Sequence, residues 1–283
     1  MNRGICFRLN PYGEFMIKLI DLFKAGAHFG HQTRFLNPKM LPNIFSARHK
    51  ISIINLDKTI EHFSTAEKFL KQAVMRNKKI LFVGTKRSAR NIFKEEAERA
   101  EVPYIVTRWL GGTMTNFATI KQRTKRLLDM EAIEESTLEK MTKKERLLFK
   151  REKDKLEKSV GGIKGMKDIP DIIFVCDVGF HKTAIAEAQK LGVTIMGIVD
   201  TNHSPEGIDY PIPANDDSTK AIELYAKWAA DCIIAGRKDN RPEMAFIEKE
   251  ENKSADDASA EEQSETATET TTETTTETTA NTN

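Results

Sequence analysis

The sequence predicts an α/β protein, with a parallel β-sheet covered by helices on both faces and interrupted by an inserted helical hairpin. Two observations support this fold class. Short apolar runs that resemble strands alternate with segments of helical length along most of the chain. Parallel strands need crossover connections of this kind, and sheets built from them are covered on both faces. A long segment dominated by Lys, Arg and Glu then separates two stretches of the same alternation.

Apolar, β-branched runs mark the predicted strands, at residues 51–56, 79–84, 104–108, 171–177 and 193–200. Helical patterns precede, separate and follow these strands, at residues 17–25, 57–75, 85–100, 181–192 and 217–234. Gly26 is the expected terminator of the first helix, and Asp57 is the expected cap of the second. The run at 51–56 and the helix after it are predicted to form the first β-α unit of the sheet.

The charged segment at residues 119–159 has sparse apolar positions that suit the seam between two antiparallel helices. These positions are Ile120, Leu127, Met130, Leu138, Met141, Leu148 and Leu156. A break at residues 134–137 divides the two helices, and the hairpin is expected to protrude. Its charges indicate either a solvated face or an arm that reaches a partner or RNA.

These boundaries predict the domain organisation. Residues 1–15 form an extension unrelated to the fold, with Met16 as an alternative start. The α/β domain comprises residues 16–117 and 161–236, the hairpin residues 118–160, and a disordered tail residues 237–283. From residue 248 onward the tail has eleven acidic residues against two lysines and no aromatic residue. Such a segment lacks the apolar area that would offset the entropy of ordering.

The charge is divided unevenly along the chain. The whole sequence carries a net charge of +2, but residues 1–247 contain 42 basic and 31 acidic residues, a net charge of +11. A basic body suggests a polyanionic partner such as nucleic acid, with a basic soluble enzyme as the alternative. Cys6, Cys176 and Cys232 have no CxxC spacing, and no apolar run approaches the ~20 residues of a membrane helix. Both observations favour a cytoplasmic protein.

Two loops carry residue types that suit contact with RNA. The segment at residues 108–116, RWLGGTMTN, places two glycines after a predicted strand, beside Arg108 and Trp109. This arrangement fits either a tight turn with a packed Trp or a close approach to phosphate. The segment at residues 28–40, HFGHQTRFLNPKM, is predicted to be a structured loop in which cations alternate with aromatic rings. Its composition suits phosphate contact and base stacking. For His28, a buried histidine whose hydrogen bonds are made within the protein is an equally good explanation.

Asp177 and Asp200 each end a predicted strand, where ligands bind in open parallel sheets. With neighbouring residues such as His181 they are candidates to hold a divalent cation, or they cap helices and turns. The segment GTK after the strand at 79–84 lacks the second glycine of a phosphate-binding loop, and no GxGxxG follows any strand. No cofactor and no catalytic motif are therefore predicted.

Eight segments occur in the order and approximate spacing of the bacterial ribosomal protein S2 family: HFGHQTRFLNPKM, INLDKT, ILFVGTK, RWLGGTMTN, TKKE, LEKSVGGIK, IVDTN and PIPANDDS. The chain resembles this family from about residue 16 to residue 236. The resemblance implies a Rossmann-like, flavodoxin-type domain with a protruding coiled-coil hairpin. It also implies a non-catalytic, ribosome-bound protein that binds small-subunit ribosomal RNA at the head–body junction and helps to seat ribosomal protein S1.

The resemblance also implies RNA-contacting positions in the two loops and, more weakly, in the segment between them: His31, Arg34, Lys39, Arg48, Lys50, Arg108, Trp109 and Asn116. Structural alternatives remain open, because Trp109 could only pack under the hairpin and Asn116 could only cap its first helix. The segment DVGFHK departs from the charged run of many members and moves the histidine one place earlier, to His181. This departure weakens the expectation of a cation site there.

Overall fold

The computed structural model describes residues 17–132 and 142–238 of the 283-residue chain. The chain divides after Gly236, and the fold below belongs to the unit before that point. The predicted extension at 1–15, the break at 134–137 and nearly all of the predicted tail lie outside the described residues.

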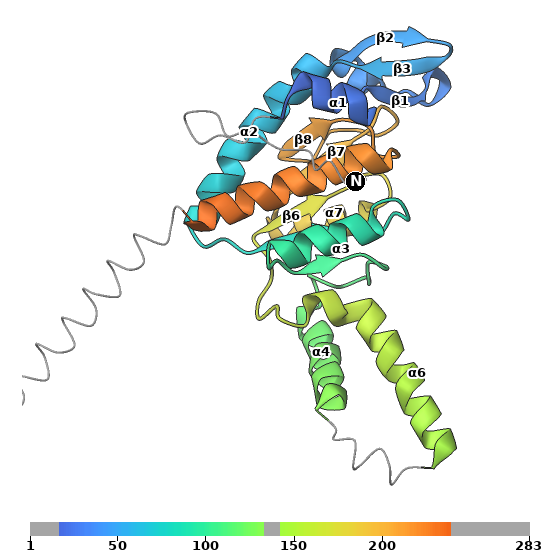
Figure 1. Ribbon diagram of the computed structural model, residues 1–283, viewed down its shortest axis with the longest axis vertical. Coiled ribbons are helices and arrows are strands. Elements are labelled where there is room, and N and C mark those ends of the chain that lie inside the picture. The colour runs from blue at the N-terminus through green and yellow to red at the C-terminus, as the bar shows by residue number, and fades with distance from the viewer. Residues whose placement is uncertain (1–16, 133–141, 239–283) are drawn as a thin grey trace, which may run out of the picture. The chain divides into compact units, whose positions relative to one another are not determined.

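A five-stranded parallel sheet forms the centre of the fold (Figure 1), in the order β5-β4-β6-β7-β8. The strands are β4 (Ile80–Val83), β5 (Tyr104–Ile105), β6 (Ile172–Val175), β7 (Thr194–Val199) and β8 (Tyr210–Pro213). Four of them confirm predicted strands. The sequence pattern missed β8, because it contains two prolines; an edge position such as that of β8 tolerates proline.

Alternate side chains of each strand pack into two separate cores, one on each face of the sheet. Phe82 and Phe174 lie in the first core, under the helices α2 (Leu56–Met75), α3 (Arg90–Arg99) and the last described helix, which begins at residue 219. Leu81 and Ile173 lie in the second core, under α7 (Lys182–Leu191) and α4 (Phe117–Glu131). The predicted α/β architecture with helices on both faces is therefore present.

A second, three-stranded antiparallel sheet precedes the parallel one. Its order is β1-β3-β2, with β1 (Phe29–Gln32), β2 (Ile44–Arg48) and β3 (Ile51–Ile54). The prediction that residues 51–56 begin the first β-α unit of the parallel sheet is wrong. A short, β-branched run such as ISII suits either kind of pairing, and here the two-residue turn after β2 folds β3 back onto it.

Short elements connect this antiparallel sheet to its neighbours. The predicted loop at 28–40 contains β1 and the 3-10 helices η1 (Thr33–Phe35) and η2 (Pro38–Asn43). The helix α1 (Leu19–Ala25) ends, as predicted, at Gly26 in the left-handed conformation. The cap of α2 is Asn55 rather than Asp57, because the Asn55 side chain accepts the Asp57 backbone N–H at 3.0 Å. We refer to residues 17–55 as the N-terminal lobe.

The predicted hairpin corresponds to α4 and α6 (Lys143–Val160), which contact each other and are drawn as a pair in Figure 1. Ile120 and Leu127 of α4 are buried in the second core, whereas Leu148 of α6 is 55% exposed. Ile120 and Leu127 thus pack into the core beside the sheet, and Leu138 and Met141 of the predicted seam lie outside the described residues. A capping box between Thr142 and Glu145 begins α6.

The 3-10 helix η3 (Gly161–Ile163) returns the chain from α6 to the edge of the sheet. A Cβ atom on Gly162 would lie 2.2 Å from the carbonyl oxygen of Tyr104, so only glycine permits this approach to β5. Because η3 covers β5, this edge strand is protected from pairing with other chains. Across the ranges 17–132 and 142–238, every helix is too short or too polar to cross a membrane.

Candidate nucleic-acid interface

A cluster of charged side chains lies at the carboxyl ends of the parallel strands, and we call it the edge cluster: His31, Lys86, Asp177, Asp200, Asp216 and Asp217. The Lys86 ammonium is at its centre. Its Nζ lies 2.8 Å from Oδ1 of Asp216, 2.6 Å from Oδ1 of Asp217 and 3.3 Å from Oδ2 of Asp177. These carboxylates keep the pKa of Lys86 raised although burial opposes this. Lys86 is therefore an internal cation.

His31 brings the N-terminal lobe into the same cluster. Its Nδ1 lies 3.1 Å from Oδ2 of Asp200, and its Nε2 lies 3.5 Å from Oδ2 of Asp217. The hydrogen bond with Asp200 raises the pKa of His31 to about 9, so the ring is a cation at neutral pH. The backbone N–H groups of His31 and Asn37 also donate to Thr201, each at 2.9 Å. The first loop is thus fastened to the end of β7.

Two carboxyl groups of the edge cluster have pKa values that are shifted in opposite directions. Burial, together with the charges of Asp177 and Asp200, raises the pKa of Asp216 to about 8, although Lys86 opposes this shift. Burial also acts on Asp177, but the Phe180 backbone N–H and Lys86 outweigh it and lower the pKa of Asp177. Asp177 therefore has the more acidic carboxyl group of the two, and Asp216 the less acidic one.

The predicted cation candidates meet only partly in this cluster. Ligand atoms of His31, Asp200 and Asp216 lie within 4.8 Å of one another, but Asp177 is outside that trio. The Asp177 carboxylate instead accepts the Phe180 backbone N–H at 2.9 Å, which closes the turn before α7. Since His31 and Lys86 already bring positive charge to these carboxylates, a divalent cation would have to displace charges of the chain itself. The cation site stays a prediction.

Glu187 on α7 organises the second loop. Its carboxylate accepts hydrogen bonds from Trp109 Nε1 at 3.0 Å and from the backbone N–H groups of Gly112, Met114 and Thr115 at 2.8, 3.0 and 3.2 Å. These donors outweigh the effect of burial and lower the pKa of Glu187. The amides of the glycine turn therefore face a carboxylate of the chain, which leaves none of these three for a phosphate.

Glu187 is not among the residues that the sequence motifs single out, although one signal points to it. It lies among Ala184, Ile185 and Ala188, the other buried residues of α7. A carboxylate in the apolar stripe of a helix needs donors from another element. The predicted RNA contact Trp109 is one of these donors; its ring is half-buried and packs against the second core.

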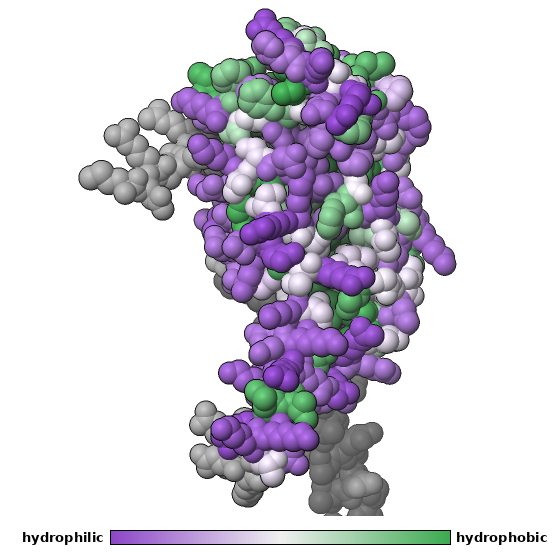
Figure 2. Space-filling view, turned by 90° about the vertical axis from the view of Figure 1, so that its right-hand side faces the viewer, coloured by the Kyte–Doolittle hydropathy of each residue, from purple (hydrophilic) through white to green (hydrophobic). Residues whose placement is uncertain are grey.

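The other predicted contacts lie in two exposed groups. The first group lies in the N-terminal lobe and consists of Arg34, Lys39, Arg48 and Lys50. The Arg34 guanidinium is 4.4 Å from the centre of the Phe35 ring, and Lys39 pairs with Glu206. Arg48 and Lys50 lie at the turn between β2 and β3. Arg108 and Asn116 form the second group. Asn116 occupies the N-cap position of α4 and accepts the Thr119 hydroxyl at 2.9 Å rather than a helical N–H. Figure 2 shows one face of the molecule covered largely by hydrophilic side chains.

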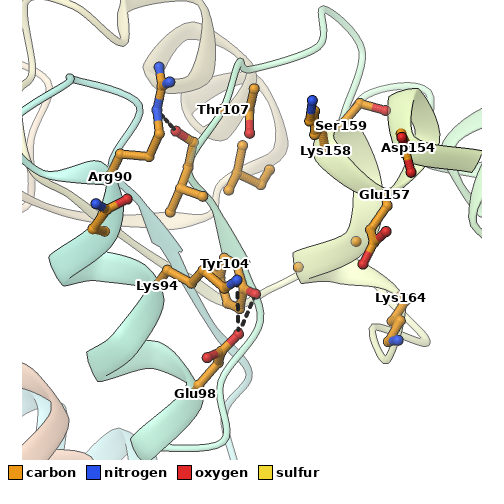
Figure 3. A pocket seen from close by; sticks show the side chains of 15 residues that line it. Arg90, Lys94, Glu98, Tyr104, Thr107, Asp154, Glu157, Lys158, Ser159 and Lys164 are labelled. Atoms are coloured by element: carbon orange, nitrogen blue, oxygen red, sulfur yellow. Dashed lines mark hydrogen bonds and ion pairs between the residues drawn. The ribbon is translucent and has the colours of Figure 1, made fainter. Parts of the chain in front are cut away.

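A cavity of about 490 Å³ lies at the base of the hairpin, between α3, β5, α6 and η3 (Figure 3). Its lining combines four cations and three acids: Arg90, Lys94, Lys158, Lys164, Glu98, Asp154 and Glu157. Of these acids, Glu98 accepts the Tyr104 hydroxyl at 2.7 Å and lies 3.9 Å from Lys94. This mixed lining differs from the N-terminal lobe, whose exposed charged groups are mainly cationic.

Comparison with known protein families assigns most of this chain to one family. The family model described as ribosomal protein S2 matches residues 22–236, which span the antiparallel sheet, the parallel sheet and the helical pair. Several of the signature segments noted in the sequence meet in the edge cluster, through His31, Lys86, Asp200 and Asp216. The chain therefore belongs to the ribosomal protein S2 family, a family of structural proteins of the small ribosomal subunit that act in translation.

Proposed function

We propose that this protein binds small-subunit ribosomal RNA at the junction of head and body, in the cytoplasm, and there helps to seat ribosomal protein S1. The observation that carries the RNA proposal is a set of exposed cations with no ion pair in the described part of the chain. They are Arg34, Arg48, Lys50 and Arg108. Together with the net charge of +11 on residues 1–247, they offer a surface that a polyanion would neutralise.

The experiment is incorporation of the full-length protein into small-subunit particles that lack it, titrated across salt concentrations. Binding that neutralises phosphates weakens linearly with the logarithm of salt, with a slope of about 0.7 to 1 per contact. A triple variant in which Arg34, Lys39 and Arg108 become alanine should weaken binding and make the slope shallower by roughly two to three.

A matched control removes the same charge from elsewhere. Lys68, Lys190 and Lys220 are also exposed, and changing all three to alanine should leave the salt slope closer to that of the wild type. If the wild-type protein never incorporates, the RNA-binding proposal fails. If both triple variants behave alike, the protein binds but the chosen contact residues are wrong.

The cavity at the base of the hairpin supports the proposal for S1. Acids make up nearly half of its charged lining, which disfavours a phosphate backbone and suits a protein segment with both signs of charge. Changing Lys94 and Lys158 to glutamate should lower the occupancy of S1 on reconstituted subunits without lowering incorporation of this protein. Deletion of residues 117–160 should lower it further; unchanged S1 occupancy in both variants would contradict this part of the proposal.

A flavodoxin-type fold without a cofactor is also part of the proposal. Numbered along the chain, the five parallel strands have the order 2-1-3-4-5, which is that of flavodoxin-type sheets, where ligands bind between strands 1 and 3. Here that position lies between β4 and β6. The backbone N–H of Thr85 points to Nε2 of His181 at 3.2 Å, and Lys86 faces Asp177 and Asp216. Groups that could hold a phosphate thus bind each other, which supports a non-catalytic role.

A further inference from the structure

We propose that the hairpin of β2 and β3 is an RNA-reading element, in which the Phe45 ring stacks on an unpaired base and Arg48 and Lys50 contact the flanking phosphates. This inference rests on the proposed binding of ribosomal RNA and deepens it. Two irregularities of the backbone, one in the strand and one in the turn, carry the argument.

The first irregularity is a bulge that turns Phe45 outward. Ile44 pairs with Ile54 and Ser46 pairs with Ile53, so two steps along β2 match one step along β3 and Phe45 is left out of the ladder. Bulges of this kind re-aim a side chain. The Phe45 side chain is 74% exposed, more than any other large apolar residue of the described chain. Burial in this protein's own core therefore does not explain the ring.

The second irregularity is the turn itself. Because Arg48 pairs with Ile51, His49 and Lys50 alone form the turn, and both have positive φ angles, of 50° and 63°. Two-residue turns of this type favour Asn-Gly, since side chains at positive φ are strained. Here the turn carries two basic residues instead. Backbone strain at residues whose side chains are exposed indicates that those side chains have a function.

The combination of a ring and unpaired cations favours RNA over a protein as the partner. In the described chain, neither Arg48 nor Lys50 forms an ion pair, and the Lys50 carbonyl accepts the Thr33 N–H at 2.9 Å. That bond places the turn next to Arg34, whose guanidinium lies over the Phe35 ring. Proteins recognise RNA by stacking unpaired bases on aromatic rings and guanidinium planes while cations follow the backbone.

The first test measures incorporation of full-length Phe45 variants into particles that lack the protein. Phe45→Ala should weaken binding about ten-fold, the effect of losing one base stack, without changing the salt slope. Phe45→Trp should keep the affinity, and Phe45→Leu should behave like the alanine variant. The matched control is Phe180→Ala, because Phe180 is 65% exposed on a different part of the chain and should be neutral.

The second test separates strain from contact. Replacing His49 and Lys50 with Asn and Gly relieves the positive φ angles, so the melting temperature should rise by about 2–4 °C. The same double variant should bind the particles more weakly, with a salt slope shallower by about 0.7 to 1. A turn of purely structural importance would not combine higher stability with weaker binding.

The outcomes distinguish this inference from the function on which it rests. If the wild type does not incorporate, the RNA-binding proposal fails and this inference fails with it. If the wild type incorporates but Phe45→Ala binds as tightly, the protein binds RNA without this hairpin and only this inference is overturned. Equal binding by Phe45→Leu and Phe45→Trp would also overturn it, because it would indicate an apolar protein contact in place of stacking.

Discussion

Lys86 in the edge cluster and Lys50 in the β2–β3 turn are both basic residues of conspicuous sequence segments, but they face different surroundings. Lys86 lies within 3.3 Å of three carboxylates, with its side chain 22% exposed. Lys50 is exposed and has no ion pair within the residues that the structure describes. Basic residues in the sequence motifs therefore serve two purposes. Inward-facing cations such as Lys86 stabilise the fold, whereas outward-facing cations such as Lys50 are open to a partner.

The largest expected effect follows from removing the inward-facing cation. Lys86→Met leaves Asp177, Asp216 and Asp217 without their shared ammonium, so the free energy of unfolding should fall by about 3 kcal/mol. Lys50→Ala should change it by less than about 0.5 kcal/mol. Urea denaturation of both variants measures the difference. Equal effects would mean that inward-facing and outward-facing cations do not differ in their contribution to stability. The loss in Lys86→Met should shrink at acidic pH, where the carboxylates are protonated.

The second effect concerns Glu187, the other inward-facing anchor. Glu187→Gln replaces one accepting oxygen with a donor and leaves backbone N–H groups of the loop without an acceptor, which should destabilise the protein by about 2 kcal/mol. Because the Trp109 indole also donates to this carboxylate, its fluorescence should shift on mutation. Glu95→Gln, at an exposed site on α3, is the control and should be neutral. An unshifted emission spectrum would mean that the carboxylate does not hold the loop.

Much of this arrangement can be predicted from the sequence, but not the direction in which side chains point. β4 and β6 are runs of four apolar residues that the two cores require, so their pattern identifies them as buried strands. β3 is a similar short, β-branched run, with Ser52 inside it, and its pairing with β2 makes it antiparallel. His31 is predicted to contact RNA, whereas its two ring nitrogens lie near carboxylates of Asp200 and Asp217, which are 169 and 186 residues further along the chain. Residue type indicates a charged role, but only the fold identifies the partner.

The third prediction tests the edge cluster by pH. The pKa of His31 is about 9 in the folded protein, against about 6.5 in an unfolded chain. Its stabilisation is therefore complete below pH 6.5 and is lost as the pH rises through 9. Asp216 acts in the same direction at lower pH, because its folded pKa of about 8 exceeds its ordinary value of 3.8. A raised pKa of this kind also makes stability fall as the pH rises.

The free energy of unfolding should accordingly decline between pH 7 and 9, by at most about 1.4 kcal/mol per pH unit for each group that titrates. His31→Asn should remove most of the decline above pH 8. His203→Asn is the control, since burial lowers the pKa of His203 and its titration lies outside this window. Denaturation curves at several pH values decide the matter, and a decline that survives in His31→Asn would show that other groups titrate there.

The smallest expected effect lies within the second loop and compares two adjacent glycines. Gly112 has a φ of +85°, and a Cβ atom there would lie 3.2 Å from that of Asn116, whereas nothing lies within 4 Å of a Cβ on Gly111. Gly112→Ala should therefore destabilise the protein by about 1 kcal/mol, and Gly111→Ala should be neutral or slightly stabilising. Thermal unfolding of the two variants measures the difference. Since the Gly112 N–H donates to Glu187, strain there loosens the inward-facing anchor, while Gly111 borders only the open surface. Equal effects at the two glycines would mean that the loop is not held as tightly as its hydrogen bonds to Glu187 imply.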